Sequence, residues 1–224
     1  MLRPLRMGLA AAALAAAFLG SGCSDSPGPG TSIPALLLAP AEAPTADSPG
    51  GALRVVEWCW NHLDVELYRT VFTDDYRFVF SALDPAGNAY RTDPWTREDE
   101  IQALAGLAAS GPLEVAVNLD RNFRIADDPR PGHLPTWHRL IRTSVTVHLV
   151  TADQRVFDVT GYANFFLVRG DSAMIPLDLT QKGVQPDPTR WYVERWEDET
   201  SGADGMHTTP AVRKTWGSIK LLYR

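Results

Sequence analysis

Residues 140–169 read LIRTSVTVHLVTADQRVFDVTGYANFFLVR, and this stretch decides the fold class of the chain. Its two halves, residues 140–151 and 155–169, are rich in the β-branched and aromatic residues that favour β-strands. Only the short segment 152–154 separates them. Two long strand-forming runs joined by so short a loop predict an antiparallel hairpin.

Further strands are predicted on both sides of this hairpin. Val115, Val117 and Leu119 alternate with the other residues of 114–120, which is typical of a half-buried strand. Residues 76–80 and 191–196 are aromatic-rich and predict two more strands, the first beginning after a break at residues 73–75. Residues 174–188 are expected to be a connector, and residues 216–223 a last apolar segment.

The first helix is predicted near residue 48. Ser48 followed by Pro49 is typical of a helix start, with a hydroxyl cap and proline at the first helical position. Leu53, Val56 and Trp60 then recur at helical spacing on one face. We therefore expect Trp60 to be a core residue.

Two more helices are predicted before the long strands. Asp64 can cap a short helix that carries Tyr68, and Thr96 with Asp99 resembles a capping box for a third helix. Helices first and long antiparallel strands afterwards indicate an α+β domain. The expected architecture is N-terminal helices packed on a curled, mostly antiparallel sheet.

Several local strings resemble one known superfamily. WCWNHLDVELY at 58–68 followed by FTDDY at 72–76 is similar to the helix–helix–strand opening of nuclear transport factor 2-like (SnoaL-like) proteins. WTREDEI at 95–101 is similar to their third helix, and RWYVERWED at 190–198 to their penultimate strand. The resemblance covers roughly residues 50–224.

The resemblance implies a cone-shaped α+β fold with a pocket between the sheet and the helices. Members of the superfamily include ketosteroid isomerase, scytalone dehydratase, polyketide cyclases and many binding or assembly modules. Fold alone therefore does not decide function. None of the enzymes' acid–base residue sets matches this sequence position by position, so no catalytic residue is predicted.

The N-terminus resembles a lipoprotein signal. Arg3 and Arg6 precede the apolar run 7–19, and small residues lead to Cys23. A cysteine at that place resembles the lipobox of bacterial lipoproteins, although Gly20 stands where the family usually has leucine or a similar residue. We therefore expect a signal peptide over 1–22, lipidation of Cys23, and an extracytoplasmic protein anchored to the membrane of a bacterial cell envelope.

Composition divides the rest of the chain into two parts. Residues 23–47 are rich in proline, glycine, alanine and serine and predict a flexible, lipidated tether, whereas residues 48–224 suit one domain. The formal net charge of −6 at pH 7 becomes −8 if the two arginines of the signal are removed. The remaining cations are scattered, so no nucleic-acid partner is expected.

Two sets of side chains are candidates for ligand binding. Aromatic residues of the helices and strands could line an apolar pocket with polar handles, although ordinary core is the more frequent role. His148 shares a strand face with polar residues, and this face could line the cone or face solvent. The candidate ligand-binding residues are Tyr68, Tyr76, His148, Tyr162, Asn164 and Trp196.

No metal site or cofactor is expected. Common nucleophile, phosphate-binding and metal motifs are missing from the sequence. His133 and His138 flank a proline-rich loop, where a solvated loop is favoured over a metal site. Cys59 is expected to be a buried core thiol, and it is the one cysteine left after lipidation of Cys23. A solvated charged turn is predicted for Glu197, Asp198, Glu199 and Asp204.

The sequence favours a non-catalytic function for a lipid-anchored envelope protein. The main hypothesis is binding of a small hydrophobic ligand or of a partner protein. One alternative is an acid–base isomerase, dehydratase or cyclase acting on a small molecule, which needs a titratable side chain inside a pocket. Another is a structural module that forms a homodimer through its sheet.

Overall fold

The structure is a computed structural model that describes residues 42–202 and 214–224. The predicted signal peptide, Cys23 and most of the predicted tether lie outside these residues. The elements follow in this order: α1 Pro49–His62, α2 Val65–Arg69, β1 Phe72–Val79, the 3-10 helix η1 Pro85–Arg91, β2 Trp95–Thr96, α3 Arg97–Ala109, β3 Glu114–Leu119, β4 Arg124–Asp127, β5 His138–Val150, β6 Val156–Arg169, α4 Leu177–Gln181, β7 Trp191–Gly202 and α5 Trp216–Leu222.

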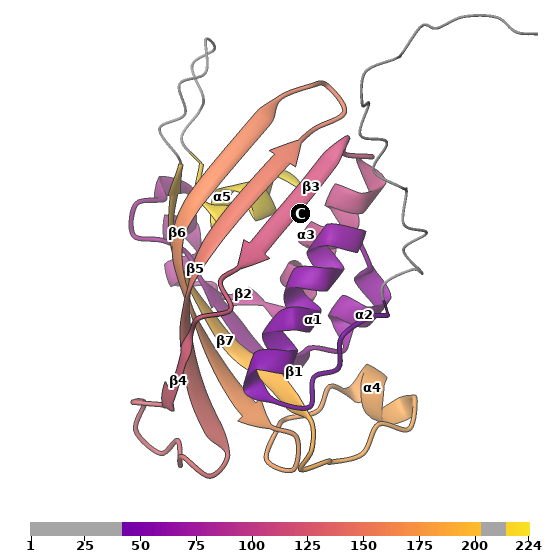
Figure 1. Cartoon of the computed structure of the whole chain (residues 1–224), viewed down its shortest axis with the longest axis vertical. Helices are drawn as coiled ribbons and strands as arrows, with labels where there is room; N and C mark the ends of the chain where they lie inside the picture. Colours follow the sequence, from indigo (N-terminus) through magenta and orange to yellow (C-terminus); the bar gives the residue numbers. More distant parts are fainter. Residues whose placement is uncertain (1–41, 203–213) are drawn as a thin grey trace, which may run out of the picture. The chain divides into compact units, whose positions relative to one another are not determined.

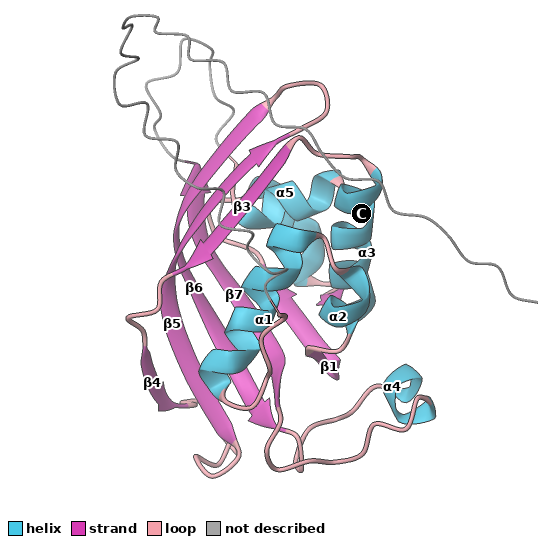
Figure 2. Ribbon diagram, turned by 45° about the vertical axis from the view of Figure 1, so that its right-hand side comes forward, coloured by secondary structure: helices cyan, strands magenta, loops and turns pink. Residues whose placement is uncertain are grey.

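The predicted α+β class, with N-terminal helices on a curled, mostly antiparallel sheet, is confirmed. Seven strands form one sheet in the order β2-β1-β7-β6-β5-β3, and β4 pairs with the outer end of β5. The pairing of β1 with β7 is parallel, and the other pairings are antiparallel. The sheet curls, and α1, α3 and α5 lie against its inner face (Figures 1 and 2).

Three helices begin where the sequence predicts. Ser48 Oγ accepts a hydrogen bond from the Gly51 N–H at 3.0 Å, and Asp64 Oδ1 accepts one from the Leu67 N–H at 2.9 Å. Thr96 forms the reciprocal capping box of α3 with Asp99. These caps satisfy backbone N–H groups that a helix leaves unpaired at its first turn, so local chemistry fixes the helix starts.

Two strand predictions are wrong in their limits, and two short elements were not predicted. β1 begins at Phe72, which pairs with Val193 of β7, and runs through the expected break at 73–75 before the pairing resumes, after a register shift, at Arg77. β7 extends to Gly202 because its second half pairs with β6, so Glu197, Asp198 and Glu199 lie on a strand and not in a turn. Asp204 lies outside the described residues. The proline-rich loop is preceded by the short strand β4, and the expected connector contains α4.

Gly161 lies near the middle of β6. Its φ of 147° is one that residues with a side chain rarely adopt, and an added Cβ would come within 2.7 Å of Glu199 O. The register places Gly161 opposite Val145 on β5 and Thr200 on β7. The glycine therefore allows the backbones to approach closely in the middle of the sheet, as curled sheets require.

The core lies between the inner face of the sheet and the helices. Trp60 is 1% exposed, which confirms the sequence prediction, and Cys59 is fully buried beside it. Burial raises the pKa of the Cys59 thiol to about 12, so this thiol is a core group. The largest side chains of the core include Trp60, Trp95, Trp196, Trp216, Tyr68 and Tyr76.

The described chain also contributes residues ahead of α1. Ala46 O accepts a hydrogen bond from the Trp191 N–H at 2.8 Å, and Ala46 packs against the core. The end of the predicted tether thus contacts the start of β7. Within the described ranges, no helix combines the length and hydrophobicity of a membrane span.

Candidate functional site

A polar cluster fills the interior where the resemblance implies a pocket. Its centre is Glu100 on α3, whose carboxylate accepts hydrogen bonds from Tyr68 Oη at 2.6 Å and from Trp95 Nε1 at 3.0 Å. Trp60 Nε1 donates in turn to Tyr68 Oη at 2.9 Å. Every member of this cluster is buried, so it is an internal network with no exposed edge.

Lys220 on α5 completes this cluster. Its Nζ lies 2.7 Å from Glu100 Oε1, and neither side chain is exposed. The ammonium also lies 3.4 Å from the ring centroid of Trp196 and 3.7 Å from that of Phe78. Burial lowers the pKa of Lys220 to about 8, against the opposing effect of Glu100. Aromatic faces and one carboxylate thus share a buried cation.

Two buried aspartates hold α5 against the inner face of the curled sheet. Asp198 on β7 accepts hydrogen bonds from the Gly217 N–H at 2.9 Å and from Thr200 Oγ1 at 2.6 Å. Asp84 accepts from Thr215 Oγ1 at 2.8 Å and from Ser218 Oγ at 2.7 Å. Burial raises the pKa of Asp198, although these hydrogen bonds and Lys220 oppose the rise. The last helix is therefore bonded on two sides and closes the interior.

The interior holds groups of the kind that acid–base enzymes use, but it is closed. Burial and the neighbouring Glu100 raise the pKa values of Tyr68 and Tyr76 well above the usual value. A lysine ammonium, a carboxylate and two phenols can exchange protons among themselves. A substrate needs a path to them, and Glu100, Lys220 and both tyrosines are completely buried.

The six predicted ligand-binding residues fall into two groups. Tyr68, Tyr76 and Trp196 lie in the interior, where all three are fully buried. His148, Tyr162 and Asn164 project from β5 and β6 on the outer face of the sheet, and Tyr162 is 46% exposed. The sheet separates the two groups, so they cannot line one pocket. Ligand binding by either group stays a prediction.

The outer face of the sheet is a network of exposed polar pairs. His148 Nδ1 lies 2.7 Å from Asp158 Oδ1, and the His148 side chain is 39% exposed. Arg142 stacks over the Tyr162 ring at 3.9 Å and forms an ion pair with Glu199 at 2.7 Å. The side chain of Asn164 donates to the same Glu199 at 2.7 Å. The arrangement is that of a solvated sheet face.

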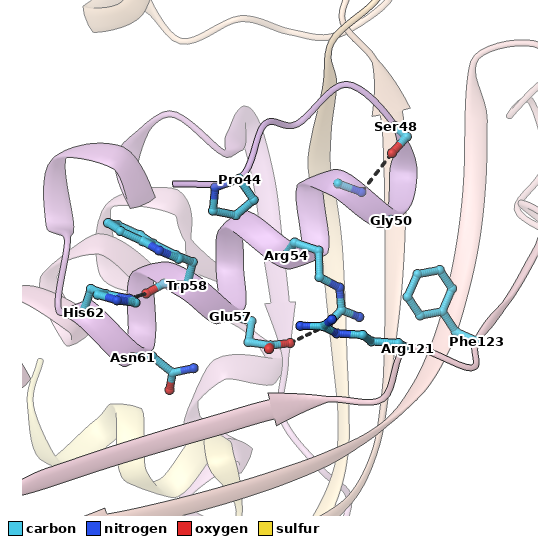
Figure 3. A pocket seen from close by; sticks show the side chains of 11 residues that line it. Pro44, Ser48, Gly50, Arg54, Glu57, Trp58, Asn61, His62, Arg121 and Phe123 are labelled. Atoms are coloured by element: carbon cyan, nitrogen blue, oxygen red, sulfur yellow. Dashed lines mark hydrogen bonds and ion pairs between the residues drawn. The ribbon is translucent and has the colours of Figure 1, made fainter. Parts of the chain in front are cut away.

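A groove lies outside the interior, along the exposed side of α1. We call it the α1 groove; it has a volume of about 530 Å³ (Figure 3). Its walls come from α1, from the segment before α1 and from the loop after β3. The residues that line it are Pro44, Ser48, Gly50, Gly51, Arg54, Glu57, Trp58, Asn61, His62, Arg121 and Phe123.

Three polar side chains of α1 pair with the free edge of β3 at the floor of this groove. The Asn61 amide donates to Val117 O at 2.9 Å and accepts from Val117 N at 2.6 Å. Glu57 accepts from the Leu119 N–H at 3.1 Å, and Arg54 donates to Leu119 O at 2.9 Å. These side chains occupy hydrogen-bonding positions that a neighbouring strand would otherwise take.

The groups left for a ligand are aromatic faces and hydrogen-bond donors. Trp58 stacks on His62 with ring centroids 4.0 Å apart, and its indole Nε1 is buried without an acceptor among the described residues. Phe123 forms the far wall with Arg54 near its ring, and the exposed Arg121 adds a second guanidinium. The carboxylate of Glu57 already holds Arg54 and β3. The groove therefore suits a ligand with apolar groups and acceptors.

A second, smaller cavity of about 310 Å³ lies at the end of β1. Phe78, Phe80 and Tyr90 supply aromatic surface, and the guanidinium groups of Arg77, Arg91 and Arg195 contribute positive charge. One of these cations is engaged, because Arg195 Nε donates to Glu197 at 2.7 Å. An aromatic wall beside arginines suits a small anion whose remaining part is apolar.

Neither the α1 groove nor the role of Lys220 is predicted from the sequence. The polar residues Arg54, Glu57 and Asn61 are spaced like one helix face, which is a local signal beside the apolar stripe of α1. Nothing local marks Lys220, because its partner Glu100 lies 120 positions earlier in the chain. That pair becomes visible only when α5 reaches α3.

Comparison with solved structures finds proteins of similar fold at low sequence identity. A conserved protein from Planctomyces limnophilus is 14% identical with a TM-score of 0.46, over 68% of this chain and 95% of that chain. A nuclear transport factor 2-like superfamily protein from Salmonella enterica is 13% identical with a TM-score of 0.44, over 72% and 92%. A ketosteroid isomerase-like protein from Erwinia carotovora atroseptica is 11% identical with a TM-score of 0.42, over 69% and 92%. No protein-family model and no curated protein matches the sequence.

Proposed function

We propose that this protein is a non-catalytic binding module whose α1 groove takes an extended segment of a partner protein. The partner segment carries at least one carboxylate together with apolar side chains. Lipidation at Cys23 holds the module at the envelope membrane. One observation supports this proposal most directly. The hydrogen-bond acceptors of the groove are already bonded to β3, whereas its hydrogen-bond donors and aromatic rings remain for a ligand.

Charge supports an acidic partner. Arg121 is exposed at one end of the groove, and Arg54 lies next to it along the wall (Figure 3). Burial lowers the pKa of Arg54, with the nearby Arg121 adding to that effect and Glu57 opposing it. A carboxylate placed between the two guanidinium groups would relieve this repulsion and could form bidentate hydrogen bonds.

The shape of the site supports a partner segment over an enclosed small molecule. All eleven lining residues come from α1, the segment before it and the loop after β3. A ligand in the groove would contact the domain with one of its sides, and its opposite side would remain partly exposed to solvent. Grooves beside a helix commonly receive peptide segments, with aromatic pockets for single apolar side chains.

Selection from a library of random dodecapeptides displayed on phage tests this function. We expect wild-type protein to enrich peptides that combine Asp or Glu with aromatic or large aliphatic residues. Arg121→Glu should abolish the enrichment, because it reverses the charge at the groove. Arg124→Glu is the matched control, since Arg124 is an exposed cation on β4 outside the groove, and it should leave the enrichment unchanged.

Two outcomes contradict the proposal. One is selection of no consensus by the wild-type protein, and the other is a consensus that survives Arg121→Glu. Enrichment of aromatic carboxylates in a small-molecule screen, abolished by Arg91→Glu and unaffected by Arg121→Glu, would move the function to the cavity at the end of β1. The acid–base and homodimer hypotheses stay predictions, and turnover lost in Glu100→Gln would favour the first of them.

A further inference from the structure

Two histidines and a glutamate far apart in the sequence converge at the end of the sheet away from α5. His133 lies in the proline-rich loop, His138 is the first residue of β5, and Glu194 lies near the start of β7. One possible ligand atom from each of the three lies within 4.8 Å of the others. We propose that these three side chains bind a divalent transition-metal ion, with Zn²⁺ as the best match. This site is separate from the α1 groove and does not depend on its function.

Backbone geometry places Glu194 in the site. The pairing of β6 with β7 shifts register beside Glu194. Phe166 pairs with Arg195, whereas the next residue of β6, Leu167, pairs with Val193. Glu194 is therefore the extra residue of a bulge in β7. Bulges redirect the side chain of the extra residue, and they occur often beside functional sites.

The two histidines present lone pairs that need a cation. His133 Nδ1 lies 3.2 Å from Pro131 O, so Nδ1 is the donor there, and in the neutral ring Nε2 is then an acceptor. That Nε2 faces Glu194 Oε2 at 3.6 Å, and two acceptors so close repel each other unless a proton or metal ion lies between them. His138 Nδ1 is buried without a hydrogen-bond partner among the described residues. The carbonyl that orients His133 is the kind of outer partner that metal-binding histidines usually have.

The charge of the surroundings favours a cation. Arg130 is bound by the buried Asp128 through hydrogen bonds of 3.1, 3.0 and 2.6 Å, and it also contacts Glu194. Burial tends to raise the pKa of Asp128, but the hydrogen bonds from Arg130 hold it below its usual value. The carboxylates of Asp128 and Glu194 and the guanidinium of Arg130 leave one net negative charge beside the two imidazoles. Arg130 therefore orients Glu194 without neutralising the site.

Ligand type and exposure indicate zinc. Two imidazoles and one carboxylate are a common set for Zn²⁺ with an open fourth position. Donor atoms around a tetrahedral Zn²⁺ are roughly 3.4 Å apart, so small side-chain rotations would close the observed spacing. The side chains of His133 and Glu194 are 25% and 16% exposed. Water can therefore enter the fourth position, and the ion would join the loop before β5 to β7.

Calorimetric titration of the full chain with ZnCl₂ tests the site, with Co²⁺ absorption as a second readout. We expect one ion per chain, a Co²⁺ spectrum typical of tetrahedral coordination, and a melting temperature that rises with zinc. His133→Gln and Glu194→Gln should each weaken binding about 100-fold or more, because each removes one of three ligands. Both variants retain the cysteines, so they separate this site from zinc binding by thiols.

His148→Gln is the matched control. His148 also lies beside two carboxylates, Asp158 at 2.7 Å and Glu114 at 3.8 Å, but among the residues that the structure describes no second histidine belongs to that group. This variant should bind zinc as the wild type does. Equal zinc affinity in wild type and His133→Gln would overturn the proposal, as would binding lost in His148→Gln. A third outcome would also overturn the proposal: a wild-type protein that binds no zinc but becomes more stable as the pH falls from 7 to 5. In that case a proton, and not a metal ion, would lie between His133 and Glu194.

Discussion

Lys220 and Glu100 form an ion pair of 2.7 Å in which neither side chain reaches solvent. The pair joins the last helix to α3, and rings of Trp196 and Phe78 flank the cation. A buried pair is costly to desolvate, so its geometry and its additional hydrogen bonds decide whether it stabilises the fold. Here Glu100 has two further donors, Tyr68 and Trp95.

Breaking this pair from one side should destabilise the domain strongly. Lys220→Met leaves the Glu100 carboxylate buried without its cation, which typically costs about 3–5 kcal/mol. The double variant Lys220→Met, Glu100→Gln should recover a large part of that loss, because no buried charge remains. Urea unfolding followed by circular dichroism measures both values. Additive losses in the double variant would show that the two side chains act independently.

Stability should rise with pH above about pH 8 and then fall. Burial lowers the folded-state pKa of Lys220 to about 8 from its ordinary value of 10.5, so the unfolded chain binds more protons between these values. The free energy of unfolding therefore increases with pH across this window, by up to ~1.4 kcal/mol per pH unit. The raised pKa values of Tyr68 and Tyr76 reverse the trend above about pH 10, where the unfolded tyrosines lose their protons first.

Chemical denaturation from pH 7 to pH 11 measures this profile. Lys220→Met is the control that should remove the rise above pH 8 while keeping the fall caused by the tyrosines. A wild-type profile that is flat or falling between pH 8 and pH 10 would contradict the assignment to Lys220.

Trp60 should be far more important for stability than its neighbour Trp58. Trp60 is 1% exposed and donates to Tyr68 Oη, so Trp60→Ala should cost about 3–5 kcal/mol. Trp58 is only partly buried and lines the α1 groove, so Trp58→Ala should cost less. Equal melting temperatures for wild type and Trp60→Ala would mean that α1 presents another face to the core.

Asn61 should protect the edge of the sheet. Asn61→Leu leaves the Val117 N–H and C=O without their partners, which should cost about 1–3 kcal/mol and expose a strand edge. We expect the variant to self-associate, as measured by light scattering after size-exclusion chromatography. Asn118→Ala, at an exposed position of the same strand, is the control and should stay like the wild type. An Asn61→Leu protein of wild-type stability and size would show that Arg54 and Glu57 suffice.

Cys23 should carry the membrane anchor. In a bacterial host, wild-type protein should enter the detergent phase of a Triton X-114 separation, whereas Cys23→Ser should not yield a mature, detergent-partitioning form. Cys59→Ser is a control for processing only, because the buried Cys59 thiol belongs to the core. A wild-type protein whose mature N-terminus is another residue and which stays in the aqueous phase would contradict lipidation.

The sequence predicted best those features that depend on neighbouring residues. The caps at Ser48, Asp64 and Thr96 need only residues two or three positions away, and all three form. The extent of β7 was missed because Glu197–Glu199 look like a polar turn, and only pairing with β6 makes them a strand. Glu194 and the two histidines are distant in sequence and meet through a bulge, so spacing alone could not bring them together.

The insertion of α5 into the cone determines when the protein can fold. Lys220 follows its partner Glu100 by 120 positions in the chain, and the interior is incomplete until α5 is in place. A growing chain can form α1, the hairpin of β5 and β6, and most of the sheet, but it cannot close its core before residues 215–220 are available. Native packing is therefore delayed until α5, which follows β7 in the chain, has been made.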